Sequence, residues 1–108
     1  MKKNNITKFP SGAIRDTSEN KEDWIETIPW TALGGYAKWM TGKKAKYGEG
    51  NFKKGIPIES YEKSVVRHMH KYLANKYEGA GIEEQEDHVY SMIFNLLGIK
   101  FEQLRGNK

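Results

Sequence analysis

The feature of the sequence that most constrains its fold is the spacing of apolar side chains over residues 57–97. Intervals of three or four residues connect Ile58, Tyr61, Val65, Met69 and Tyr72, and later Val89, Met92, Ile93 and Leu96. Such intervals place each set on one face of an α-helix. A polar stretch with two glycines, residues 75–81, separates the sets. The sequence therefore predicts two helices that fold back on each other, one starting at Pro57 and one over residues 83–97, ended by Gly98.

A third helix is predicted earlier in the chain. Pro29 suits a first helical turn, and Trp30, Leu33, Ala37 and Met40 follow it at helical spacing. No pair of segments indicates strands. We therefore expect an all-α fold, a small bundle of three main helices with an extended N-terminal arm. The chain of 108 residues suits one domain, with an arm and loop at residues 1–28 and a helical body at 29–104.

The composition narrows the possible locations and partners. There is no cysteine, which suits a reducing compartment. No apolar run approaches the roughly 20 residues of a membrane span, and the polar first residues do not form a secretory signal. We therefore expect a cytoplasmic protein without a membrane partner. The formal net charge of +4 is modest. A nucleic-acid partner is not expected, because the basic segment at residues 38–54 is short and the acidic segment at residues 82–88 would repel a duplex.

Charge is unevenly distributed along the chain. Residues 38–54 contain six lysines and one acid, whereas residues 82–88 contain four acids and no lysine or arginine. A polyanion held by the lysines and a metal held by the carboxylates would explain this pattern. Two solvated faces of opposite sign would explain it equally well.

The segment from residue 46 to residue 55 combines three glycines with Lys46, Lys54 and two aromatic residues, Tyr47 and Phe52. Glycine turns whose N–H groups converge bind anions, and the rings offer flat surfaces to a base. An ordinary glycine-rich connection is the alternative. On the third helix, His88, either Ser91 or Met92, and Asn95 share one edge. An asparagine in so apolar a helix requires a polar partner.

Several ordered motifs resemble a phage-associated family, the dATP/dGTP diphosphohydrolase N-terminal domain. They are SGAIR at 11–15, IPW at 28–30, KYG at 46–48, NF at 51–52, KG at 54–55, RH at 67–68, EDH at 86–88, and Asn95. The resemblance implies a nucleoside triphosphate pyrophosphohydrolase. Within these motifs we expect Glu86, Asp87 and His88 to be the catalytic residues. The ligand-binding residues would be Arg15, Lys46, Tyr47, Asn51, Phe52, Lys54, Arg67, His68 and Asn95.

A looser similarity is to the MazG-like all-α pyrophosphohydrolases, which bind Mg²⁺ through paired acids on two helices. Glu59 and Glu62, then Glu84 and Asp87, match that order. Residues three apart share a helix face, so each pair offers two carboxylates to a hard cation. The competing assignment groups Glu86, Asp87 and His88 with His68, with or without a metal.

Two functions remain open at this point. One is a Mg-dependent (deoxy)nucleoside triphosphate pyrophosphohydrolase. The other is a non-catalytic sponge that sequesters a nucleotide second messenger of bacterial anti-phage immunity. Both take a small nucleotide as partner. A homo-oligomer is expected because the helices carry five aromatic residues on more than one side, too many for one small core: Tyr36, Trp39, Tyr61, Tyr90 and Phe94.

Overall fold

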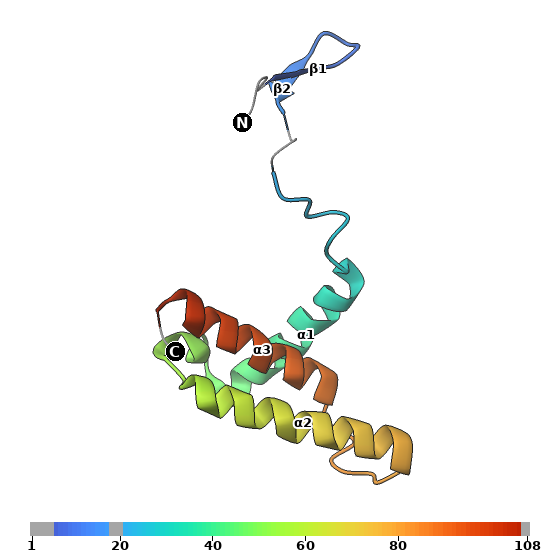
Figure 1. Ribbon diagram of the computed structural model, residues 1–108, viewed down its shortest axis with the longest axis vertical. Coiled ribbons are helices and arrows are strands. Elements are labelled where there is room, and N and C mark those ends of the chain that lie inside the picture. Colours follow the sequence, from blue (N-terminus) through green and yellow to red (C-terminus); the bar gives the residue numbers. More distant parts are fainter. Residues whose placement is uncertain (1–5, 18–20, 107–108) are drawn as a thin grey trace. The chain divides into compact units, whose positions relative to one another are not determined.

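The computed structural model describes residues 6–17 and 21–106, which are mainly helical (Figure 1). The elements are strands β1 (Ile6–Lys8) and β2 (Ile14–Asp16), helix α1 (Trp30–Tyr47), a 3₁₀ turn η1 (Asn51–Lys54), and helices α2 (Ile58–Glu78) and α3 (His88–Leu104). The three predicted helices are confirmed. The chain divides into two compact units, Met1–Leu33 and Gly34–Lys108. That the whole chain forms a single domain stays a prediction.

The first unit contains a β-hairpin that the sequence did not predict. β1 and β2 pair antiparallel, with Thr7 opposite Arg15. Phe9 N–H donates to the carbonyl of Ala13 and Gly12 N–H to that of Phe9, each at 2.9 Å. Gly12 has a φ of 93°, which suits a residue without a Cβ. The prediction of a purely α-helical chain was wrong here, because three-residue, largely exposed strands leave no alternation of apolar side chains to recognise.

The second unit is organised around α2 and α3, which lie side by side and antiparallel (Figure 1). Tyr61 on α2 is 2% exposed. Its ring covers Gly98, where a Cβ would fall on the ring carbons, and meets Phe94 edge-on at 5.9 Å between ring centroids. The prediction that Gly98 ends the helix was wrong, since α3 continues to Leu104. Gly98 therefore allows α2 and α3 to pack closely and does not end α3.

The start of α3 also differs from the prediction. The acids Glu83, Glu84 and Glu86 precede the helix instead of forming its first turn. Asp87 is the N-cap residue, and its side chain accepts a hydrogen bond from the backbone N–H of Tyr90 at 2.8 Å. An aspartate in this position satisfies an amide that the helix leaves unpaired. The helix therefore begins five residues later than the apolar spacing and acidic residues indicated.

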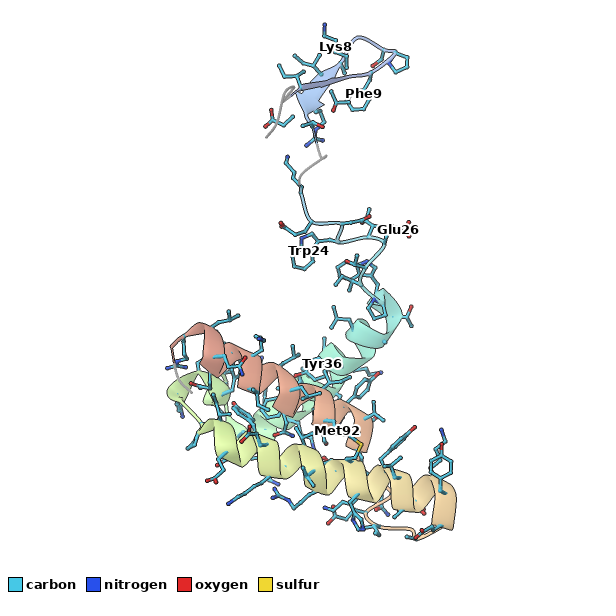
Figure 2. The ribbon with its side chains drawn as sticks, in the orientation of Figure 1. Lys8, Phe9, Trp24, Glu26, Tyr36 and Met92 are labelled. Carbon is cyan, nitrogen blue, oxygen red and sulfur yellow. The ribbon has the colours of Figure 1, made fainter. Side chains whose placement is uncertain are left out.

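Aromatic residues join α1 to α3 within the second unit. Tyr36 (Figure 2) lies 6.1 Å from Tyr90, and Trp39 lies 6.0 Å from Tyr90, between ring centroids. Gly35 leaves room for the Tyr90 hydroxyl, which a Cβ would overlap. These rings pack within one chain, so they no longer argue for a partner subunit. The homo-oligomer itself stays a prediction.

Candidate functional site

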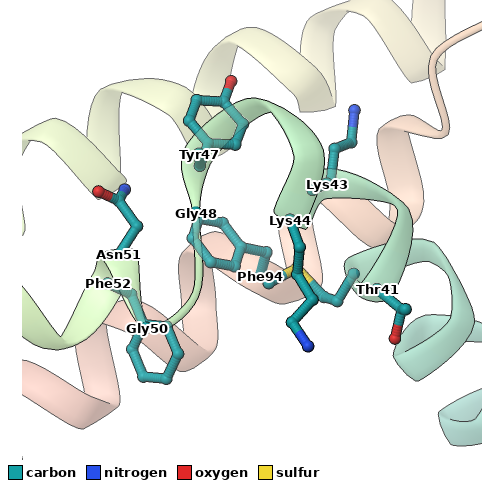
Figure 3. Close-up of a pocket in the computed structure, with 10 residues that line it drawn as sticks. Thr41, Lys43, Lys44, Tyr47, Gly48, Gly50, Asn51, Phe52 and Phe94 are labelled. Atoms are coloured by element: carbon teal, nitrogen blue, oxygen red, sulfur yellow. The ribbon is translucent and has the colours of Figure 1, made fainter.

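A cavity of about 210 Å³ opens between the end of α1, the glycine turn and α3 (Figure 3). A second cavity of about 260 Å³ adjoins it and shares Met40, Lys43, Tyr47, Asn51 and Phe94 with it. We call the two together the central cavity. The second part is further lined by Trp39, Ile56, Ser64, His68, Glu86, Ser91 and Asn95. Small-molecule sites typically occupy about 300–1,000 Å³ and are mainly apolar with a few placed polar groups.

The glycine turn gives one wall of the central cavity its shape. α1 ends at Tyr47, and Gly48 and Gly50 follow with φ values of 81° and 64°. These left-handed conformations turn the chain into η1. In η1, Phe52 packs edge-on against Phe101, with 5.1 Å between ring centroids. The turn thereby directs Asn51 and Phe52 toward the cavity (Figure 3).

A cation and a carboxylate face each other in the cavity wall. Lys43 Nζ lies 3.4 Å from the Glu86 carboxylate and 5.0 Å from the centroid of the Trp39 ring. The Ser91 hydroxyl donates to Glu86 Oε1 at 3.1 Å. Burial favours the neutral form of Glu86, but the Ser91 hydrogen bond and the charge of Lys43 outweigh it, so the pKa of Glu86 lies below its ordinary value. Glu86 is therefore ionised at neutral pH.

Two histidines form the polar centre of the site. His68 Nδ1 and His88 Nδ1 are 2.9 Å apart. His88 is 6% exposed, and its Nε2 lies 3.2 Å and 3.1 Å from the carbonyl oxygens of Ile82 and Glu83. Burial lowers the pKa of His68, and neighbouring His88 and Lys71 lower it further. His68 is therefore neutral near pH 7.

The lowered pKa of His68 predicts a pH effect on stability. The unfolded chain binds the proton more readily than the folded chain, so the free energy of unfolding decreases as the pH falls below about 6.5, the ordinary histidine value. The part of this decrease that is due to His68 levels off below the pKa of His68 in the folded state. Urea midpoints between pH 7.5 and pH 5 measure this change, and we expect a smaller decrease in the His68→Gln variant. An identical decrease in both proteins would contradict the assignment.

The structure gathers six of the predicted site residues around the central cavity: Tyr47, Asn51, Phe52, His68, Glu86 and Asn95. Asn95 is buried, and its amide donates to the carbonyl of Ser91 at 2.6 Å. A shared edge was predicted for His88, Asn95 and either Ser91 or Met92. The structure has Ser91 in that position, since His88, Ser91 and Asn95 are the buried residues on α3.

Other predicted residues of the second unit do not line this cavity. Glu84, Asp87 and His88 border a separate open depression of about 580 Å³, next to Glu86. Glu59, Glu62 and Arg67 border a surface groove on the outer side of α2. Lys46 and Lys54 are exposed. Arg15 lies on β2, in the first unit.

The predicted metal ligands do not come together in the described chain. Glu59 and Glu62 lie in the first turns of α2, whereas Glu84 and Asp87 lie next to α3's N-terminus, at the other end of the antiparallel pair. Among residues 6–17 and 21–106 no group of three or more histidine, aspartate or glutamate residues is suited to hold a metal. In the cavity wall, Glu86 is the carboxylate that a cation would meet.

Sequence reasoning missed several lining residues, chiefly Lys43, Ser64 and Ser91 as a ligand-facing hydroxyl. A signal for them exists. Trp39, Lys43 and Tyr47 are four residues apart along α1, and Ser64 and His68 are four apart along α2. Residues at this spacing share a helix face. Following the helix face back by four residues leads from the predicted Tyr47 to Lys43 and from the predicted His68 to Ser64.

Comparison with known proteins identifies a family. The family described as dATP/dGTP diphosphohydrolase, N-terminal, matches residues 11–107. No curated protein and no solved structure matches the chain. Within the described residues, no helix is both long enough and apolar enough to cross a membrane.

Proposed function

The chain belongs to the dATP/dGTP diphosphohydrolase N-terminal family, and from this premise we propose that its central cavity binds a purine deoxynucleoside triphosphate and hydrolyses it. The products would be the monophosphate and pyrophosphate. The observation that carries the proposal is the position of His68, a neutral histidine at the wall of an aromatic cavity that also contains a lysine.

The lining of the cavity suits the two halves of such a ligand. Tyr47, Phe52 and Phe94 offer ring surfaces to a base, and base–aromatic stacking is worth about 1–3 kcal/mol per base. Lys43 would meet the phosphates in place of its long, 3.4 Å contact with Glu86. Phosphoryl transfer depends mainly on positioning and on neutralising charge, and Lys43 contributes to both.

His68 would act as the general base. In its neutral form it accepts a proton from a water molecule as the water oxygen attacks the α-phosphorus. The bond from that phosphorus to the bridging oxygen breaks, and pyrophosphate leaves. A histidine that is neutral at pH 7 is suited to this role, because its unprotonated nitrogen can take up a proton in the transition state.

We propose that Mg²⁺ enters bound to the triphosphate. Mg²⁺ is usually held through one or two carboxylates together with substrate phosphates, which fits a wall with one ionised carboxylate, Glu86. The four acids predicted as metal ligands would not hold this ion together, because the two pairs lie at opposite ends of the α2–α3 pair. When bound, the ion would neutralise phosphate charge.

Release of pyrophosphate from each deoxynucleoside triphosphate, with and without Mg²⁺, tests the proposal. We expect turnover of dATP and dGTP in the presence of Mg²⁺, and little turnover of dCTP and dTTP. No pyrophosphate from any of the four would exclude hydrolysis of these substrates.

One observation favours the second candidate, a protein that captures a nucleotide second messenger of anti-phage immunity without cleaving it. The described residues supply rings and lysines to the cavity but no cluster of metal ligands. Incubation with a cyclic dinucleotide followed by heat release separates the two functions. Intact nucleotide in the supernatant, together with no turnover of triphosphates, would support capture, and a cleaved product would contradict it.

A further inference from the structure

The two histidines at the site are unequal in their surroundings. His68 lines the central cavity, whereas His88 is buried behind it and contacts the loop between α2 and α3. Both Nδ1 atoms point at each other across 2.9 Å. At this distance one nitrogen must donate a proton and the other must accept it, since two N–H groups would repel and two lone pairs would form no bond.

The backbone decides which histidine donates. Nε2 of His88 faces the carbonyl oxygens of Ile82 and Glu83, which are acceptors. Nε2 of His88 must therefore carry hydrogen. A neutral imidazole has one N–H, so Nδ1 of His88 is the acceptor and Nδ1 of His68 is the donor.

The loop carbonyls are held in place by side chains of α2. The Asn75 amide donates to the Ile82 carbonyl at 2.9 Å, and its oxygen accepts from the Ile82 N–H at 2.7 Å. Lys71 pairs with Glu83 at 2.9 Å. Glu83 itself has a φ of 45°, a conformation uncommon for residues other than glycine. This loop is thus fixed where its carbonyls meet His88.

We infer that His88 is a positioning residue, which fixes His68 in the Nδ1–H tautomer and leaves Nε2 of His68 as the unprotonated nitrogen available to a ligand. The catalytic meaning of this arrangement rests on the proposed function, because a base requires a lone pair where the water is bound. The tautomer itself does not rest on it. Within the described chain, Nε2 of His68 has no hydrogen-bond partner, which agrees with that role. His88 would then act through His68 and not on the substrate.

Long-range ¹H–¹⁵N correlation spectra of the nucleotide-free protein, at a pH where both histidines are neutral, test the tautomers. We expect His68 to be protonated at Nδ1 and His88 at Nε2. His68 protonated at Nε2 would overturn the inference. Because no nucleotide is present, this result is independent of whether the protein hydrolyses triphosphates.

Two variants extend the test. In His88→Gln, the amide can donate to the loop carbonyls while its oxygen accepts from His68, so we expect the His68 tautomer to be retained. In His88→Leu the acceptor is lost, and we expect a mixture of His68 tautomers and a fall in kcat of about tenfold, with KM little changed. An unchanged His68 tautomer in His88→Leu would contradict the inference. If that variant does not fold, the spectra of the wild type and of His88→Gln still decide.

Discussion

Replacing His68 by glutamine is expected to lower kcat for dATP or dGTP by 10²- to 10⁴-fold, the usual range for loss of a general base. At 1.36 kcal/mol for each factor of ten, this corresponds to about 3–5 kcal/mol of transition-state stabilisation. Glutamine keeps an amide that can donate toward His88, so the packing of α2 against α3 should survive. KM should change little, because the cavity rings and Lys43 remain. Steady-state pyrophosphate release measures both constants.

The matched control is His70→Gln, two residues further along the same helix. His70 is exposed and lines no cavity described above. It should retain wild-type kcat and the same circular dichroism spectrum. Equal losses in the two variants, or full activity in His68→Gln, would show that His68 is not the base.

Replacing Gly98 by alanine is expected to destabilise the fold by about 1–3 kcal/mol, the range for overpacking a core. The added Cβ would overlap three carbons of the Tyr61 ring, which is rigid and 2% exposed. Alanine favours helix over glycine by about 1 kcal/mol, so the measured loss is the net of both effects. In a small domain, 1 kcal/mol shifts Tm by about 4–8 °C. Thermal and urea unfolding measure the change.

Gly34→Ala provides the comparison, since Gly34 is also helical but has nothing within 4 Å of the position that a Cβ would take. It should raise stability by up to about 1 kcal/mol. A double-mutant cycle with Tyr61→Ala should show strong coupling to Gly98→Ala, because removing the ring removes the overlap. Additive effects would mean that the ring and the glycine do not touch.

The sequence predicted the three helices and the starts of two of them, but it did not predict where α3 begins and ends. Pro29 and Pro57 predicted the starts of α1 and α2, which begin at Trp30 and Ile58. Glycine was ambiguous, because the same residue ends helices and permits close contact between them. Gly98 does the second, and only the position of Tyr61 across the pair reveals it. The acids before Asp87 led to a predicted helix start at residue 83, whereas α3 begins only after the N-cap residue Asp87.

The candidate site was likewise predicted only in part. Residues in short segments that fold as units, such as Asn51 and Phe52 in the glycine turn, were predicted and line the cavity. Grouping carboxylates by motif failed to bring them together, because spacing within each helix does not determine which ends of two helices meet. Glu59 and Asp87 lie at opposite ends of the antiparallel pair for that reason. The contact of Lys43 with Glu86, 43 residues apart, requires the packed structure.

The hydroxyl of Tyr61 is buried and has no hydrogen-bond partner among the described residues. An unsatisfied buried polar group costs about 1–3 kcal/mol, which is a large part of what a small domain has in total. One oxygen atom therefore limits the mutational robustness of the whole helical unit. A chain with phenylalanine at this position would avoid that cost and would tolerate more destabilising substitutions elsewhere in the unit.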